Sequence, residues 1–389
     1  MTETEKLLRE LIGIPSVNPA YLPAGNAYAG EQRMAQFVAK RARRAGLEVE
    51  LQQVFPNRPN VLVRLAPKGK IRQRVLLAPH LDTVGGLGLP PPLGGVELPG
   101  QFFTPRIKGN RLYGRGACDT KGSVAVMLTA LEELARGAQR PANTEITFAG
   151  LIDEESGQNG SRALVKSHFK ADLAIVGEPT RLQVVTAHKG VVWLELRTLG
   201  RAAHGSHPEL GINAVEDMAR IVVVLLSEYA ARLRSRKHPL LGQATINVGA
   251  MHGGSQPNVV PGECRSLIDR RTLPGETDAA VVKEIQRMIK TLKLKGGFKW
   301  RNIQGGPCPA LQTDPKLSLV HLFFQCAGQS RAAAADFFSD AGVLSAGGLP
   351  SVLFGPGDIA QAHTPDEWVA LEQLQRGKDL LVKFLCRLP

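Results

Sequence analysis

The segment Val75-Leu76-Leu77-Ala78-Pro79-His80-Leu81-Asp82 indicates the fold class, because a short apolar run ends there in polar residues. Such a run is typical of a strand that is buried on both faces of a sheet. Comparable runs lie at 146–151, 174–176 and 351–354, and a strongly periodic helix is expected at 121–137. Strands that alternate with helices predict an α/β fold: a three-layer αβα domain whose mixed, mostly parallel sheet is covered by helices on both faces.

Residues 183–303 have a different pattern from the rest of the chain. Strands are expected there at 191–197, 244–250 and 264–271, and long helices at 213–233 and 276–292. This order is typical of a small α+β unit inserted into a larger domain. We therefore expect one discontinuous domain made of residues 1–182 and 304–389, and an inserted domain made of residues 183–303.

Composition excludes several classes of protein. The chain has 389 residues, of which 43% are hydrophobic, so we expect more than one folded domain and no extensive disorder. No apolar run reaches the roughly 18 residues that span a bilayer. The first residues lack the pattern of a secretory leader, and the five cysteines are scattered, with no CxxC pair. We expect a cytoplasmic protein without a membrane segment.

The net charge of +13 has two interpretations. Basic clusters at 40–44, 232–237 and 290–301 could form a surface for nucleic acid or another acidic partner. They also fit the solvent-exposed faces of helices in a basic protein. We favour exposed helix faces and expect no nucleic-acid partner, because no nucleic-acid-binding motif accompanies the charge and the clusters lie far apart in the sequence. A positive field would still attract anionic substrates.

Side chains that can bind a metal follow the expected strands of the larger domain. Four of these strands each end close to such a side chain: His80, Glu155, Glu178 and His363. Asp119 lies in a glycine-rich loop directly before an expected helix. Because ligands of open α/β sheets bind beyond the carboxyl ends of the strands, we expect these five side chains to meet.

The five side chains match the ligands of zinc. Two histidines and three carboxylates form a nitrogen and oxygen set that Zn²⁺ accepts. Two zinc ions carry a charge of +4 and three carboxylates a charge of −3, which leaves +1 for a bridging hydroxide to neutralise. Asp119 is the natural bridge, since its carboxylate can offer one oxygen to each metal. Two metals about 3.5–4 Å apart would lower the pKa of the water and polarise a carbonyl.

Two further acidic residues have expected roles beside these ligands. Glu154 adjoins Glu155 but points in another direction, so it is a candidate general base that takes a proton from the water and passes it to the leaving nitrogen. Asp82 lies two residues after His80, a spacing that lets it accept a hydrogen bond from the ring nitrogen not bound to metal. Each motif alone fits an ordinary structural role, and only their combination favours a metal site.

The sequence resembles a known family along nearly its whole length. In this order, the motifs APHLDTV (78–84), GRGACDTKG (114–122), DEESG (153–157), VGEPT (176–180) and GPGDIAQAHTPDE (355–367) are similar to those of certain zinc metallopeptidases. That family includes acetylornithine deacetylase, succinyl-diaminopimelate desuccinylase, aminoacylase and the carboxypeptidase G type. The resemblance implies that His80, Asp119 and Glu178 hold one zinc ion and that Asp119, Glu155 and His363 hold the other, with Co²⁺ as an alternative metal.

The resemblance also implies roles beyond the metal ligands. Glu154 would be the acid/base, Asp82 the partner of His80, and the peptide bond between Asp119 and Thr120 would be cis. Residues 183–303 resemble the family's lid, which also forms a homodimer, and the remainder would be the catalytic domain.

Three residues of the expected lid match family positions that face the substrate. His204 in GRAAHGS matches a histidine that stabilises the oxyanion. Arg271 in DRRTLPGE and Asn258 in GGSQPNVVP match residues that meet the substrate carboxylate. Each of the three could instead be a turn or surface residue. Arg270, next to Arg271, is an alternative candidate for contact with the substrate carboxylate. His188 in AHKG matches a family motif and equally fits a structural role.

The leading functional hypothesis is hydrolysis of a small N-acyl amino acid, as in acetylornithine deacetylase. It rests on the segments VGEPTRLQVVTAHKG and GPGDIAQAHTPDE. Succinyl-diaminopimelate desuccinylase and a dipeptidase or glutamate carboxypeptidase are alternatives, since family members share the metal site and differ in pocket walls. A binding protein without catalysis is disfavoured, because it would be expected to lack a ligand or Glu154. The alanines before Asp336 replace the family's Ser or Thr, which leaves side-chain specificity open there.

Overall fold

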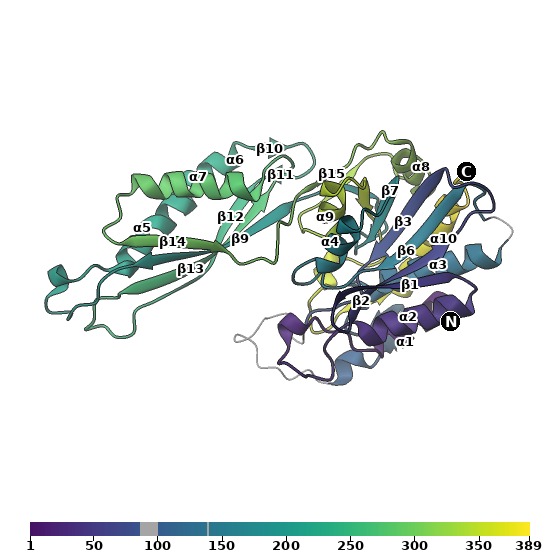
Figure 1. Ribbon diagram of the computed structural model, residues 1–389, viewed down its shortest axis with the longest axis horizontal. Helices are drawn as coiled ribbons and strands as arrows, with labels where there is room; N and C mark the ends of the chain where they lie inside the picture. The colour runs from purple at the N-terminus through teal and green to yellow at the C-terminus, as the bar shows by residue number, and fades with distance from the viewer. Residues whose placement is uncertain (86–99, 138–139) are drawn as a thin grey trace. The chain divides into compact units, whose positions relative to one another are not determined.

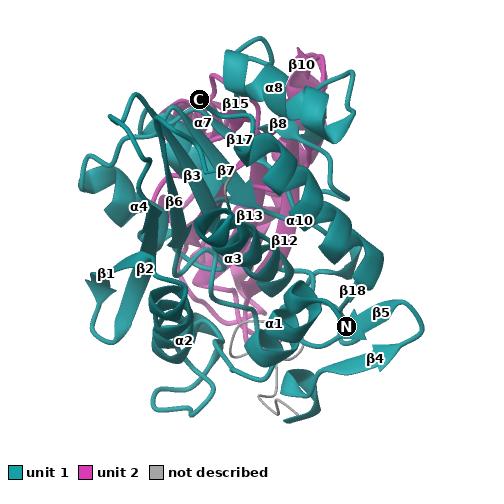
Figure 2. Ribbon diagram, turned by 90° about the vertical axis from the view of Figure 1, so that its right-hand side faces the viewer, with its two compact units in different colours: residues 1–187, 312–334, 339–389 teal, residues 188–311, 335–338 magenta. Residues whose placement is uncertain are grey.

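A computed structural model describes residues 1–85, 100–137 and 140–389 of the chain. These residues form two compact units (Figure 2). The first unit contains Met1–Ala187, Gln312–Ala334 and Ser339–Pro389, and the second contains His188–Leu311 and Ala335–Phe338. The chain therefore leaves the first unit and later returns to it. The boundaries expected after residues 182 and 303 lie five and eight residues before the observed ones, and residues 335–338, expected in the larger domain, belong to the second unit.

A nine-stranded mixed sheet forms the framework of the first unit (Figure 1). The central strands β6, β3, β7 and β17 run parallel, whereas β2 pairs antiparallel with β1 and β6, and β8 pairs antiparallel with β17. The strand order is β1-β2-β6-β3-β7-β17-β8-β15, and β16 pairs with β8. The strands are β1 (Glu48–Phe55), β2 (Arg58–Leu65), β3 (Gln73–Pro79), β6 (Thr144–Gly150), β7 (Leu173–Gly177), β8 (Val185–His188), β15 (Leu311–Gln312), β16 (Ala333–Ala335) and β17 (Ser351–Leu353).

Helices cover both faces of this sheet. Leu77 and Ile175 point into a core that the sheet shares with α1, α2, α3, α8 and α10. Leu76 and Ala174, which point to the opposite face, are equally buried, and α4 and α9 contact the sheet outside that core. The α/β prediction is therefore confirmed. The helices are α1 (Glu3–Ile12), α2 (Gln32–Arg44), α3 (Lys121–Arg136), α4 (Asn159–Lys166), α8 (Ser318–Ala327), α9 (Asp340–Ala346) and α10 (Leu371–Leu385).

Helix α3 and a small sheet position the segments that carry two of the expected ligands. α3 is rich in Ala, Val and Leu and is buried on nearly all sides, which suits its place between the large sheet, α1 and α10. The small antiparallel sheet has the order β18-β5-β4, with β4 (Arg106–Lys108), β5 (Arg111–Tyr113) and β18 (Trp368–Ala370). Because β5 pairs with β18, the segment leading to Asp119 runs beside the segment that follows His363.

The second unit is of the α+β type. Its four-stranded sheet is antiparallel, with the order β12-β13-β9-β14. Alternate residues of β9 are buried and partly exposed, so one face of the sheet packs against helices and the other faces solvent. The elements are β9 (Gly190–Leu199), α5 (Ala214–Val224), α6 (Ala230–Arg234), β10 (Lys237–His238), β11 (Gly242–Gln243), β12 (Thr245–Gly253), β13 (Glu263–Thr272), α7 (Asp278–Thr291) and β14 (Gly297–Asn302).

The helices of the described residues can be compared with two predictions, the long helix at 213–233 and the absence of a membrane segment. The long helix expected at 213–233 consists of α5 and α6, joined by a π-helical segment at Leu225–Tyr229. Within residues 1–85, 100–137 and 140–389, every helix is too short or too polar to cross a membrane. Short 3₁₀ segments complete the structure at Pro19–Tyr21, Gly100–Phe103, Pro208–Leu210 and Ile359–Gln361.

Candidate metal centre

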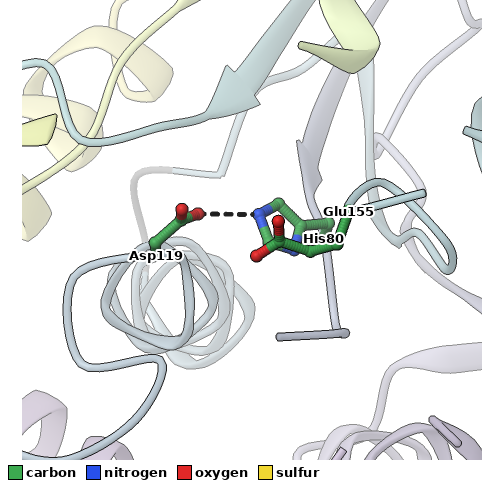
Figure 3. Close-up of side chains that lie close together, drawn as sticks. All are labelled: His80, Asp119 and Glu155. Carbon is green, nitrogen blue, oxygen red and sulfur yellow. Dashed lines mark hydrogen bonds and ion pairs between the residues drawn. The ribbon is translucent and has the colours of Figure 1, made fainter. Parts of the chain in front are cut away.

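Three of the expected metal ligands lie together in the first unit (Figure 3). His80, Asp119 and Glu155 each offer one ligand atom, and these atoms lie within 4.8 Å of one another. His80 follows β3, Asp119 precedes α3, and Glu155 follows β6. Because β3 and β6 pair in parallel, their carboxyl ends share one edge of the sheet, which explains why His80 and Glu155 meet.

Asp119 lies between two histidines. Its Oδ1 is 2.9 Å from Nε2 of His80, and its Oδ2 is 3.2 Å from Nε2 of His363. Nε2 of His363 is also 3.1 Å from Oε2 of Glu155. The two oxygens of one carboxylate thus face different imidazoles, as a carboxylate that bridges two metals would require. The peptide bond between Asp119 and Thr120 is cis, as the resemblance implied.

Glu178, the fifth expected ligand, follows β7 and is buried. Burial raises the pKa of its carboxyl well above the usual value, and repulsion from Asp119 adds to this effect. Among the described residues, Oε1 of Glu178 and Oε1 of Glu155 are buried without a hydrogen-bond partner. Buried carboxylates are normally paired or bound to a metal. These orphaned oxygens and the imidazoles of His80 and His363 are ligand types that Zn²⁺ accepts.

The buried carboxylate of Asp82 organises the turn that follows β6. Its Oδ1 accepts the backbone N–H of Glu154 and its Oδ2 accepts that of Glu155, both at 3.1 Å. The side-chain amide of Asn18 also donates to Oδ2, at 2.8 Å. Asp82 therefore fixes the main chain of an expected ligand and of the expected acid/base at the same time.

His80 and Asp82 contact each other differently from the expected geometry. Nδ1 of His80 lies 3.0 Å from the backbone oxygen of Asp82 and 3.5 Å from its Oδ1. The imidazole therefore donates from Nδ1 to the carbonyl, which can only accept. This hydrogen bond places the proton on Nδ1 and leaves Nε2, which faces Asp119, able to bind a metal.

The turn at 153–158 depends on residues that the sequence reasoning missed. Asp153 has a φ of 68°, in the left-handed region that residues other than glycine rarely adopt. Its carboxylate accepts from Asn18 at 2.9 Å, from Arg58 at 2.8 Å and from Asn159 at 2.6 Å. The hydroxyl of Tyr21 donates to the carbonyl of Glu155 at 2.9 Å. The part of the sequence that could have pointed to Asn18 is the segment IPSVNP (14–19), which contains it.

Glu154 is buried beside the expected ligands. Burial raises the pKa of its carboxyl well above the usual value, and repulsion from Glu178 raises it further. A carboxyl with a raised pKa can hold a proton near neutral pH, which is what a general acid/base needs. The roles of Glu154 and of the five expected ligands toward metal or substrate remain predictions.

His204 and Asn258 lie side by side in the second unit. The N–H of Gly205 donates to the carbonyl of Asn258 at 2.7 Å, and His204 forms a β-bridge with Val259. Nδ1 of His204 accepts the N–H of Ser206 at 3.2 Å. When Nδ1 accepts this N–H, the imidazole can donate from Nε2.

The second unit also distinguishes Arg271 from Arg270. Arg270 is buried, and its guanidinium donates to Glu276 at 2.7 Å. Arg271 is partly exposed, and its Nε and Nη2 donate to the two carboxylate oxygens of Asp269 at 2.9 and 3.1 Å. Its guanidinium also lies 5.7 Å from the centre of the Phe338 ring. A guanidinium has five N–H donors, so this pairing leaves donors for a second carboxylate.

The chain matches known proteins over most of its length. The model of Peptidase family M20/M25/M40 matches residues 76–387. An acetylornithine deacetylase of Edwardsiella ictaluri is 30% identical over 387 residues, which cover 97% of this chain and 96% of the relative. An acetylornithine deacetylase of Vibrio cholerae is 30% identical over 331 residues, 84% of each chain.

Solved structures share the fold at lower identity. The aminopeptidase PepT of Bacillus cereus superposes with a TM-score of 0.77 at 20% identity, covering 99% of this chain and 97% of its own. An M20 family metallo-carboxypeptidase of Sulfolobus solfataricus gives a TM-score of 0.77 at 19% identity and covers 99% of each chain.

Proposed function

This chain belongs to peptidase family M20/M25/M40, and on that premise we propose that it is a zinc-dependent hydrolase that removes the acetyl group from an N-acetylated amino acid such as N-acetylornithine. The observation that carries the proposal is the position of Asp119, with one carboxylate oxygen facing His80 and the other facing His363. The match to acetylornithine deacetylases across nearly the full chain favours this substrate class over succinylated amino acids and peptides.

The proposed cofactor is a pair of Zn²⁺ ions. His80, Asp119 and Glu178 would hold one ion, and Asp119, Glu155 and His363 would hold the other. Bound there, the two ions would supply a lowered pKa of water and a polarised substrate carbonyl. The unpartnered buried oxygens of Glu155 and Glu178 support a cation at this place. Co²⁺ accepts the same ligand types and is the proposed substitute.

Glu154 is the proposed carrier of the proton. Its carboxylate takes a proton from the attacking water as the new C–O bond forms, and returns it to the amide nitrogen as the C–N bond breaks. The products are acetic acid and the amine, which at neutral pH are acetate and the protonated amine. Burial raises the pKa of Glu154, which favours the protonated form between these two steps. Asp82 holds the backbone of Glu154 and so limits the positions open to its carboxyl group.

Three residues of the second unit are proposed to contact the substrate. His204 donates from Nε2 to the oxyanion that develops on the attacked carbonyl, since its Nδ1 accepts from Ser206. Arg271 pairs with the α-carboxylate through guanidinium donors that Asp269 does not use. Asn258, whose carbonyl binds the loop of His204, contributes its side-chain amide to the same carboxylate.

The first test combines elemental analysis of the purified protein with hydrolysis of N-acetylornithine before and after chelation. We expect close to two zinc ions per chain, with activity lost on chelation and restored by zinc. Two zinc ions with turnover of only succinyl-diaminopimelate or dipeptides would replace the proposed substrate class by one of the alternatives. A chain that takes up neither zinc nor cobalt would overturn the proposal.

The proposal extends to assembly and location. A homodimer through the second unit is supported by its edge strand β12 and by Val223 and Leu226, which are 63% and 47% exposed. Sedimentation of the native chain and of Leu226→Glu tests it, since only the native chain should sediment as a dimer. We place the enzyme in the cytoplasm, because five scattered cysteines are typical of a reducing compartment.

A further inference from the structure

We infer that Glu367 is a positioning residue for the metal centre, which holds the backbone of Asp119 in place before any metal binds. The inference rests on the proposed function, in which Asp119 bridges the two metal ions. Glu367 is only 3% exposed and is not one of the proposed ligands. Its carboxylate instead binds the loop that ends in Asp119.

Both oxygens of the Glu367 carboxylate accept hydrogen bonds from this loop. Oε1 accepts the backbone N–H of Cys118 at 2.8 Å and that of Asp119 at 2.9 Å. Oε2 accepts the backbone N–H of Gly116 at 2.8 Å and a guanidinium N–H of Arg115 at 2.9 Å. Backbone N–H groups that converge on an anion form a concave site, and hydrogen bonds to an ionised acceptor are stronger than neutral ones.

These contacts link two segments that lie far apart in the sequence. Glu367 follows His363 on one segment, and Asp119 ends the other. The N–H of Gly114 donates to the carbonyl of Glu367 at 3.0 Å, and β18 pairs with β5 directly beyond this point. Glu367 therefore joins the segments that supply His363 and Asp119, which are proposed to share one metal ion.

The competing interpretation is that Glu367 is only half of a buried ion pair with Arg115. The first unit contains a matched pair with which to separate the two interpretations. Glu132 is also 3% exposed, and its carboxylate accepts two hydrogen bonds from Arg41, at 2.7 and 2.9 Å. Glu132 lies on α3 and contacts none of the five proposed ligands through a described hydrogen bond. Loss of either buried carboxylate should lower stability, but only loss of Glu367 should disturb Asp119.

The test compares Glu367→Gln with Glu132→Gln in the full chain. Titration of the metal-free proteins with Co²⁺ is followed by calorimetry and by visible absorption, and melting temperature is recorded. We expect Co²⁺ affinity about 10–100-fold weaker for Glu367→Gln, with altered absorption bands, because residues that orient metal ligands typically have effects of this size. Glu132→Gln should melt earlier than the native chain with unchanged Co²⁺ affinity and bands. Equal Co²⁺ affinity in the two variants would overturn the inference.

A measurement on the native chain covers the case in which Glu367→Gln does not fold. Hydrogen exchange of the metal-free protein should show protected amides at Cys118 and Asp119, since Glu367 accepts both N–H groups without metal. Exchange at the rate of an unfolded segment would show that no carboxylate holds this loop and would refute the inference. Failure of the native chain to bind Co²⁺ would instead count against the proposed function, so the two failures are distinguishable.

Discussion

Oδ1 of Asp82 accepts the backbone N–H of Glu154 at 3.1 Å, although Asp82 follows β3 and Glu154 follows β6. The same carboxylate accepts the N–H of Glu155. An acidic residue that the sequence suggested as a partner of one histidine thus holds the main chain of two glutamates. The orientation of the proposed acid/base is consequently set by a residue that need not touch the substrate.

Replacement of Asp82 by Asn should therefore affect kcat more than it affects the free energy of unfolding. The Asn amide group would direct its own N–H donors at one of the two backbone N–H groups, which breaks a hydrogen bond. We expect kcat to fall about 10–100-fold. Asp172→Asn is the matched control, because Asp172 also accepts a backbone N–H, from Arg74 at 2.7 Å, on an exposed part of the first unit. Equal kcat values in the two variants would show that the hydrogen bonds of Asp82 do not matter for catalysis.

Replacement of Glu154 by Gln should separate proton transfer from metal binding. Gln keeps the shape of the side chain but cannot carry the proton, so we expect kcat to fall by about 10²–10⁴-fold. Metal content by elemental analysis should stay at the native value, because Glu154 is not a proposed ligand. Glu155→Gln serves as the contrast and should lose bound metal. Loss of metal from Glu154→Gln would instead place Glu154 among the ligands.

Much of this site could be predicted from the sequences of individual strands. His80 and Glu178 are predictable because each follows a buried apolar run, and parallel strands bring their carboxyl ends to one edge. The pairing of buried polar groups could not be predicted this way. Asn18 binds Asp82 over a separation of 64 residues, and Glu367 binds the N–H of Asp119 over 248. Such contacts depend on tertiary packing, which no local period or spacing encodes.

Dependence on tertiary packing also explains why the contact between His80 and Asp82 differs from the expected one. The spacing of His80 and Asp82 predicts that they interact, and they do. The backbone oxygen of Asp82, 3.0 Å from Nδ1, receives the imidazole proton, whereas Oδ1 lies 3.5 Å away. The carboxylate is turned toward the backbone N–H groups after β6 and toward Asn18, an arrangement that local sequence does not reveal.

His188 should make the second unit sensitive to acid. It is completely buried, its Nδ1 lies 2.9 Å from the carbonyl of Lys189, and burial lowers its pKa to about 4. An unfolded histidine has a pKa near 6.5, so between pH 6.5 and 4 the unfolded state binds a proton that the folded state does not. Stability contributed by the neutral imidazole is therefore complete above pH 6.5 and is lost as pH falls toward 4.

Urea unfolding of His188→Asn at pH 7 and at pH 4.5 measures this effect. The variant keeps a donor near the Nδ1 position but cannot bind the extra proton. We expect it to be less stable than the native chain at pH 7, with the gap in unfolding free energy smaller by about 2–3 kcal/mol at pH 4.5. His252→Asn, at an exposed position of the same unit, is the control for the loss of an imidazole. A constant gap for His188→Asn would mean that the buried imidazole titrates normally.

The paired arrangement of Arg271 and Asp269 leads to a prediction about substrate selection. Asp269 holds the guanidinium through Nε and Nη2, so the remaining donors have a defined direction in the second unit. Lys at this position keeps the charge but cannot present two parallel N–H groups to a carboxylate. A hydrogen bond to a charged group contributes about 1.5–3 kcal/mol, so Arg271→Lys should raise KM for N-acetylornithine about 10–100-fold, with a smaller change in kcat.

Arg301→Lys and a second substrate complete the design of this experiment. Arg301 donates to Glu195 through Nε and Nη2, both at 2.9 Å, and so matches Arg271 in geometry without a proposed substrate contact. Its replacement should leave KM unchanged. An N-acetylated amine that lacks the α-carboxylate should be a poor substrate for the native chain and no poorer for Arg271→Lys, because the lost interaction is with that carboxylate. If Arg271→Lys weakened both substrates equally, the residue would support the fold of the second unit and would not recognise the substrate.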